Sequence, residues 1–97
     1  MQLPPSDIHP KLSSRARLQT DKVTGKPVLL YPEGVLMLNP TGHAIAQLCT
    51  GEVTFQEMVD KLAARYKKTS QEISPQVAEY LHRLRERNLL EMPGTTQ

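Results

Sequence analysis

The sequence has little of what usually marks an enzyme or a secreted protein. It contains a single cysteine, Cys49, no tryptophan, and three tyrosines and one phenylalanine as its aromatic residues. One cysteine cannot form a disulfide within the chain, which fits a reducing cytoplasm. No apolar run approaches the roughly 18 residues of a membrane span, and the start of the chain lacks the basic and apolar order of a signal peptide. We therefore expect a cytoplasmic protein that neither enters a membrane nor is exported.

An excess of one charge is also missing. Twelve basic and ten acidic residues leave a net charge of +2, so composition gives little support for binding to nucleic acid. The chain of 97 residues has the usual length of one domain. Its Pro-rich opening and its last residues show no periodicity, which is typical of mobile ends. We expect a flexible arm at 1–13, one domain at 14–92 and a flexible tail at 93–97.

Motifs for catalysis and for metal binding are absent as well. His9, His43 and His82 lie in different segments without a ligand partner at metal spacing, and the sequence has no C-x-x-C pair and no glycine-rich phosphate loop. Cys49 falls on the apolar face of a predicted helix, where a thiol usually belongs to the core. The sequence therefore predicts no enzymatic activity, no cofactor and no metal.

What the sequence does contain is a pattern of three short strands. Residues 15–21 alternate between apolar and polar, as in a strand with one solvated face. Two further strands are predicted at 27–31 and 34–38, each after a short turn that contains glycine. Short turns favour an antiparallel meander, whose outer strands have unpaired backbone groups.

The third of these strands does not alternate. Val35, Leu36, Met37 and Leu38 are four apolar residues in a row, although successive side chains of a strand point to opposite faces. Helices can cover one face. From the residues alone, the N-terminal arm, a second copy of the chain or a bound peptide are all candidates for covering the other.

Capping signals predict three helices after the strands. The predicted starts are Asn39 with Pro40, Thr54 with the capping-box partner Glu57, and Ser74 with Pro75, and Asn88 ends the third helix. On the third helix, Val77, Leu81 and Leu84 are expected to face the core. Tyr80, Arg83 and Arg87 lie along one flank, and Ala78 and Arg85 lie on the other. The spacing leaves open which flank borders the sheet edge and whether Tyr80 belongs to the core.

The segments "VLLYPEGVLMLN", "IAQLCTGEVTFQEMVDKLAARY" and "LRERNLL" resemble, in this order, the PqqD family. The resemblance covers about residues 14–92 and is most specific in the LL-x-PE turn, the LN-x-T helix entry and the LC-x-GE-x-T corner. Ser14, Gln76 and Asn88 depart from the residues that are frequent in the family. The resemblance implies an α+β fold that is winged helix-turn-helix-like, with a three-stranded antiparallel sheet followed by three helices.

The resemblance also implies a function. Members of the family bind the ribosomally made precursor peptide PqqA and present it to the radical S-adenosylmethionine enzyme PqqE in pyrroloquinoline quinone biosynthesis, and related recognition domains take the peptide as an added strand beside the third strand and over the third helix. The chain is thus expected to be a peptide chaperone. The expected peptide-binding residues are Val35, Leu36, Met37, Leu38, Val77, Tyr80, Leu81, Arg83, Leu84 and Arg87.

A DNA-binding winged helix is the alternative, because it shares the fold type. Two features argue against nucleic acid: the predicted connection between Tyr66 and Ser74 exceeds the short turn of helix-turn-helix proteins, and the predicted third helix begins "SPQVAEY", without a basic residue. The exposed edge strand permits either a monomer or a strand-exchanged homodimer.

Overall fold

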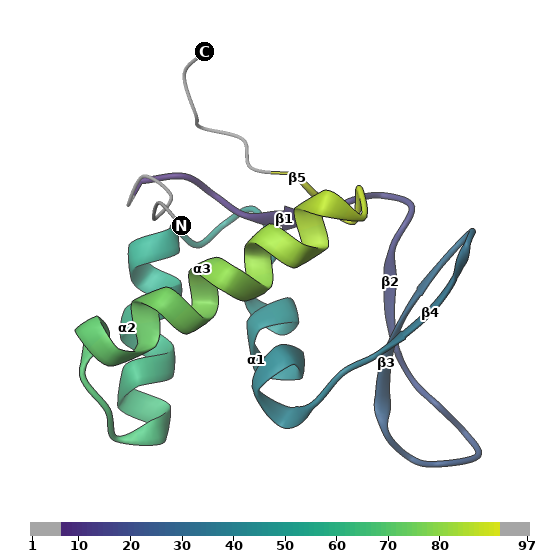
Figure 1. Ribbon diagram of the computed structural model, residues 1–97, viewed down its shortest axis with the longest axis horizontal. Helices are drawn as coiled ribbons and strands as arrows, with labels where there is room; N and C mark the ends of the chain where they lie inside the picture. The colour runs from purple at the N-terminus through teal and green to yellow at the C-terminus, as the bar shows by residue number, and fades with distance from the viewer. Residues whose placement is uncertain (1–6, 92–97) are drawn as a thin grey trace.

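The computed structural model describes residues 7–91, and the predicted meander and helices follow one another along the chain (Figure 1). The elements are β1 Lys11–Leu12, β2 Arg17–Thr20, β3 Pro27–Tyr31, β4 Gly34–Met37, α1 Pro40–Leu48, α2 Phe55–Tyr66, α3 Ser70–Glu86 and β5 Leu90–Glu91. The α+β class is confirmed. Among residues 7–91, no helix is long and apolar enough to cross a membrane.

The main sheet is the predicted antiparallel meander, in the order β2-β3-β4. A turn at Pro32 and Glu33 joins β3 to β4, so that Leu29 lies opposite Leu36 and Val28 lies opposite Met37. Strands β2 and β4 are therefore the two edges of this sheet, and β4 has no partner on its outer side among the described residues.

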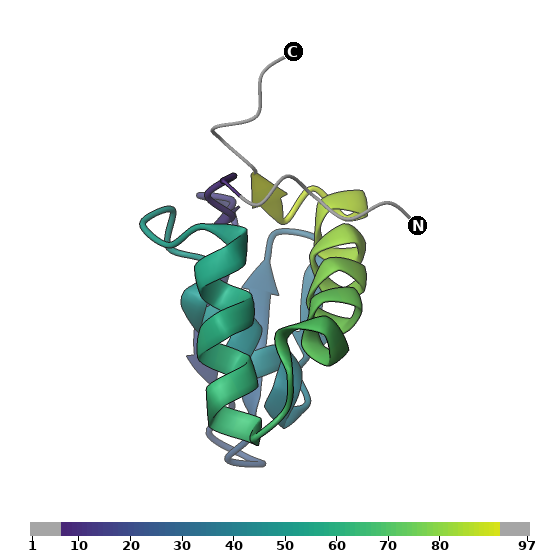
Figure 2. The same cartoon turned by 90° about the vertical axis from the view of Figure 1, so that its left-hand side faces the viewer.

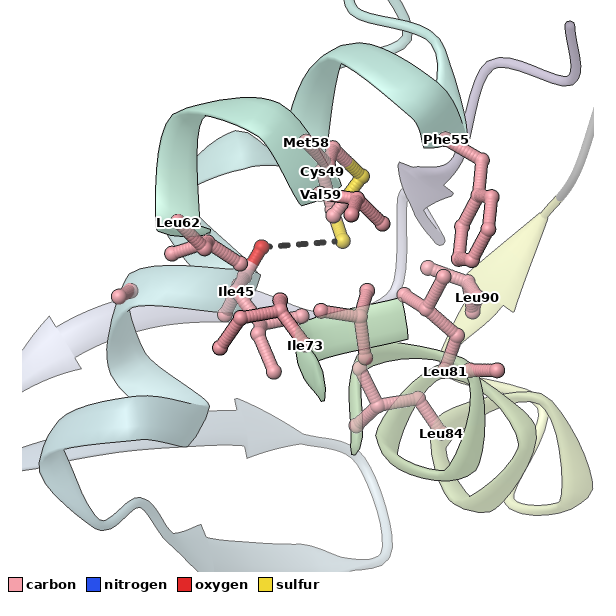
Figure 3. Packing of buried hydrophobic residues seen from close by; sticks show 14 of the residues in the cluster. Ile45, Cys49, Phe55, Met58, Val59, Leu62, Ile73, Leu81, Leu84 and Leu90 are labelled. Carbon is pink, nitrogen blue, oxygen red and sulfur yellow. Dashed lines mark hydrogen bonds between the residues drawn. The ribbon is translucent and has the colours of Figure 1, made fainter. Parts of the chain in front are cut away.

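The three helices gather on one side of the sheet (Figures 1 and 2). Each contributes apolar side chains to one core, as Figure 3 shows for Ile45, Met58 and Leu81. Leu29 and Leu38 bring the sheet into the same cluster. The predicted caps of the first two helices are present, because the Asn39 side chain accepts the amide hydrogen of Gly42, and Thr54 forms a capping box with its partner Glu57.

Helix α3 begins earlier than predicted. Its N-cap is Thr69, whose hydroxyl oxygen accepts the Glu72 amide hydrogen (3.1 Å), while the Glu72 carboxylate accepts the Thr69 amide hydrogen (2.9 Å). This capping box outweighs the signal from Pro75, which lies inside the helix. Proline there removes the bond to the carbonyl of Gln71, an exposed residue that water can reach. The predicted start at Ser74 is therefore wrong.

The connection between α2 and α3 is correspondingly short. Only Lys67, Lys68 and Thr69 separate the two helices, which is the length of a helix-turn-helix turn. The expected long connection is thus wrong, and it no longer argues against DNA binding. The end of α3 matches its prediction: Asn88 adopts a left-handed φ of 61°, and the Leu89 amide donates to the carbonyl of Leu84 (2.9 Å).

The segment before β2 is packed against the domain, contrary to the prediction of a mobile arm at 1–13. Ile8 is 0% exposed within the core, and its carbonyl accepts the Phe55 amide hydrogen (2.8 Å). Leu12 in β1 lies opposite Leu90 in β5. Backbone pairing and one isolated isoleucine give no periodic signal, so the sequence pattern missed this contact. Residues 1–6 and the predicted tail at 93–97 lie outside the described residues.

We expect Ile8→Ala to lower the free energy of unfolding by about 2–4 kcal/mol, because the substitution leaves a cavity in the core. Urea denaturation followed by circular dichroism measures the change. Val23→Ala is the matched control, since Val23 is 92% exposed and surface substitutions usually change stability by about 0.5 kcal/mol or less. Equal stability of the Ile8→Ala and Val23→Ala variants would contradict the packing of this segment.

Candidate functional site

A cavity of about 210 Å³ lies between the edge strand β4 and helix α3. It is lined by Leu36, Met37, Asn39, Tyr80, Arg83, Leu84 and Arg87, and we call it the β4–α3 groove. Leucine, methionine and tyrosine residues line it, and two arginines supply its positive charge. The groove thus combines apolar contact area with a basic rim, beside a strand edge.

The register of β4 determines which backbone groups face the groove side. The amide of Leu38 donates to the carbonyl of Pro27 (3.2 Å), so these opposed residues form a hydrogen-bonded pair. Such pairs alternate with non-bonded pairs in antiparallel strands. It follows from the register that Leu36 bonds to β3, whereas the N–H and C=O groups of Val35 and Met37 point away from the sheet. These groups are free to pair with another extended chain.

The apolar run in β4 divides between two faces. Leu36 and Leu38 point toward the helices and pack against or within the core. Val35 and Met37 lie on the outer face of the sheet and are 55% and 54% exposed. Neither the N-terminal segment nor a helix covers this outer face among residues 7–91 (Figure 1).

Tyr80 belongs to both the core and the groove. It is half-buried, packs against the core cluster and lines the groove, and burial raises the pKa of its hydroxyl. A β-carbon on Gly42 would lie 2.5 Å from the Tyr80 hydroxyl oxygen, so the Tyr80 ring can hold this position only beside a glycine. The Asn39 side chain accepts the Gly42 amide hydrogen at 2.6 Å. This bond holds Asn39, which lines the groove, in place.

The arginines lie on the flank of α3 that faces β4. Arg83 forms an exposed ion pair with Glu79, at 3.5 Å, and Arg87 lines the groove one turn further along. Arg85 is exposed and is not among the lining residues. The sequence left open which flank of this helix borders the sheet edge. In the structure it is the flank with Tyr80, Arg83 and Arg87.

Six of the ten predicted site residues meet in the groove, and Val35 lies beside it. The six are Leu36, Met37, Tyr80, Arg83, Leu84 and Arg87. Val77, Leu81 and Leu84 are 1%, 0% and 1% exposed, so their side chains belong to the core, although Leu84 also borders the groove. Leu38 is also buried. Asn39 was missed as a groove residue, because a capping signal says nothing about which neighbouring helix packs against the cap.

Cys49 is confirmed as a core residue. Its thiol contacts the carbonyl oxygen of Ile45 at 3.3 Å, as the dashed line in Figure 3 shows, and burial raises the pKa of this thiol to about 12. A buried, protonated thiol is not a nucleophile near neutral pH. In residues 7–91, no group of three histidine, cysteine or carboxylate side chains is placed to hold a metal ion.

A meander packed against three helices, with an open edge strand beside an apolar groove, defines a winged helix-turn-helix-like domain with a site suited to an extended chain. Residues 27–90 match the family model described as Coenzyme PQQ synthesis protein D (PqqD). The chain belongs to the PqqD family.

Individual relatives agree with this assignment. A protein of Methylococcus capsulatus named PqqA binding protein is 40% identical over 71 residues, which are 73% of this chain and 74% of the relative. A protein of the same name from Xanthomonas axonopodis pv. citri is 30% identical over 86 residues, or 89% of this chain and 94% of the relative.

Two solved structures share the fold. The first is the solution structure of the PqqD part of Methylobacterium extorquens PqqCD, described as a functional, stand-alone recognition element for ribosomally synthesised and post-translationally modified peptides. It aligns with a TM-score of 0.76 at 29% identity, covering 93% of this chain and 95% of that one. The crystal structure of PqqD from Xanthomonas campestris aligns with a TM-score of 0.57 at 31% identity, covering 82% and 89%.

We expect Gly42→Ala to lower the free energy of unfolding by about 1–3 kcal/mol, because the added methyl group overlaps the Tyr80 ring. Alanine is otherwise the better helix residue by up to about 1 kcal/mol, so a loss of stability identifies the overlap as the cause. In a Tyr80→Leu background the cost should fall by at least half. Urea denaturation of the four proteins measures this coupling, and an unchanged cost in that background would show that Tyr80 is not the obstacle.

Proposed function

We propose that this chain binds the precursor peptide PqqA as an added strand along β4, with peptide side chains seated in the β4–α3 groove. The observation that carries the proposal is the outward direction of the Val35 and Met37 backbone groups beside that groove. Main-chain pairing supplies affinity in strand addition, and pockets for alternate side chains supply specificity. Val35, Leu36, Met37, Tyr80 and the two arginines are the proposed contact residues, and the buried Leu84 supports the groove from the core.

The names of the relatives support PqqA as the peptide. The Methylococcus and Xanthomonas proteins are PqqA binding proteins, and the Methylobacterium domain is a recognition element for peptides of this kind. The groove residues have a matching character, since arginines next to apolar walls favour an extended peptide with acidic and apolar side chains.

We further propose that the chain acts as a chaperone, not as an enzyme, and presents bound PqqA to PqqE in the cytoplasm. The groove walls are apolar, amide, phenol and guanidinium groups, which bind an extended chain well and include no activated nucleophile. A peptide along β4 leaves α2 and the far side of the sheet uncovered (Figure 1), so a second protein has room to dock on the complex.

Duplex DNA is the less favoured ligand. The short turn between α2 and α3 is compatible with a helix-turn-helix, but the first turn of α3 has an acidic residue, Glu72, and no basic one. A recognition helix needs donors for phosphates and base edges near its start. Arg83 and Arg85 lie in the last turn of α3 and Arg87 is its C-cap. Of these, Arg83 and Arg87 border the groove.

Met37→Pro should weaken binding of a synthetic PqqA peptide about tenfold or more. Proline removes an amide hydrogen that faces the free edge. The loss of its hydrogen bond to the peptide, together with the disturbed strand geometry, costs about 1.4 kcal/mol. The fold should survive, because edge strands accept proline where the N–H points to solvent. Isothermal titration calorimetry measures the affinity.

Met37→Ala separates the backbone effect from the side-chain effect, since alanine keeps the amide hydrogen. We expect Met37→Ala to bind more tightly than Met37→Pro. A folded Met37→Pro protein with the affinity of the wild type would rule out strand addition at β4.

Arg83→Ala combined with Arg87→Ala should slow association of the peptide about threefold or more at low salt and leave dissociation nearly unchanged. Exposed charges beside a groove act mainly on the rate of encounter. The effect should largely vanish near 0.5 M salt, where the Debye length is roughly 4 Å. Arg85→Ala is the matched control, and stopped-flow kinetics at several salt concentrations gives the rates. Equal effects of Arg85→Ala and the double variant would show that the groove flank has no special role.

A further inference from the structure

A second cavity lies at the far end of β4, where the strand leads into helix α1. Its volume is about 550 Å³, against about 210 Å³ for the β4–α3 groove. It is lined by Lys26, Pro27, Leu38, Asn39, Pro40 and His43, and we call it the Pro40 cavity. Asn39, two residues after the end of β4, is the lining residue that the two cavities share.

Three apolar residues of the Pro40 cavity, Pro27, Leu38 and Pro40, lie in segments that backbone hydrogen bonds hold in place. Pro27 and Leu38 are paired across β3 and β4 through the bond from the Leu38 amide to the Pro27 carbonyl (3.2 Å). Pro40 is the first residue of α1, and the amide of His43 donates to the Asn39 carbonyl (2.8 Å). Two proline rings add stiffness, because each fixes its own φ. The cavity therefore exists before any ligand arrives.

We propose that the Pro40 cavity takes one large apolar side chain, leucine-like or aromatic, from the same peptide that lies along β4. This rests on the proposed strand addition. A strand rises about 3.3 Å per residue, so a peptide paired beside Met37 reaches Asn39 two or three residues further on. In an antiparallel peptide the inserted residue lies on the N-terminal side of the paired segment.

The chemistry of the walls favours an apolar side chain over a polar or charged ligand. The side chain of Asn39 already accepts the Gly42 amide hydrogen (2.6 Å), so its oxygen is committed to capping α1. Lys26 is exposed, and His43 is half-buried at the rim. The remaining lining is two prolines and a leucine. The volume lies in the range of about 300–1,000 Å³ typical of small-ligand pockets, and is ample for one side chain.

Filling the cavity provides the test. His43→Trp places an indole in the Pro40 cavity, and Gln47→Trp places the same side chain on the exposed surface of the same helix. The probes are synthetic PqqA of Methylococcus capsulatus and its single alanine variants, titrated by calorimetry into wild type and both tryptophan variants. Met37→Pro is titrated in parallel as the readout of strand addition.

In wild type, one alanine replacement outside the strand-paired segment should weaken binding about tenfold or more, the size expected for removing a buried apolar side chain. In His43→Trp the peptide should bind more weakly, and the same replacement should cost less than about twofold. Gln47→Trp should behave as wild type. Contacts between that peptide side chain and the Pro40 and His43 protons, seen as nuclear Overhauser effects in the wild-type complex, test the site without a substitution.

The outcomes separate the two proposals. If the peptide binds and Met37→Pro weakens it, but His43→Trp binds as wild type or no such contacts appear, the Pro40 cavity is not a subsite and strand addition stands. If no peptide binds wild type, or Met37→Pro has no effect, strand addition fails and the subsite fails with it.

Discussion

The amide of Leu38 donates to the carbonyl of Pro27, and this one bond identifies the register on which the groove depends. With this register, Leu36 and Leu38 point toward the helices, and the backbone of Val35 and Met37 points away from the sheet. A shift by one residue would exchange the two sets, exposing core leucines and turning the free edge groups inward. The turn at Pro32 and Glu33 holds the register at the other end of the hairpin.

The opposite wall of the groove has a separate origin. Helix α3 is anchored by a capping box at Thr69 and closed by the left-handed Asn88, and its middle rests on α1 where Gly42 makes room for Tyr80. Both walls are therefore set by packing and capping within the domain. A site of this kind loses little conformational entropy when a ligand enters, which is the advantage of preorganisation.

Much of this arrangement was predictable from local sequence signals, and what escaped was non-local. The meander, the caps at Asn39 and Thr54, and the helix end at Asn88 each depend on a few neighbouring residues. Pro75 misled the prediction of the α3 start, although Thr69 and Glu72 repeat the motif already recognised in α2. The burial of Ile8 had no local signal at all, because it depends on a core assembled from the other end of the chain. The family resemblance predicted that a peptide binds beside β4 and over α3. Helical spacing predicted the two flanks of α3 but did not decide which of them faces β4.

The short ladder between β1 and β5 joins the two ends of the described chain, with Lys11 opposite Glu91. Strands near both ends of the chain therefore lie side by side, and β4 with its groove belongs to a separate sheet. A domain whose terminal strands lie in a different sheet from its binding edge can be fused to another protein through a terminus without a linker that crosses the binding edge. The Methylobacterium relative, whose PqqD domain is part of a longer PqqCD chain, is an arrangement that such geometry permits. The pairing of β1 with β5 thus suits this domain to use as one part of a longer protein.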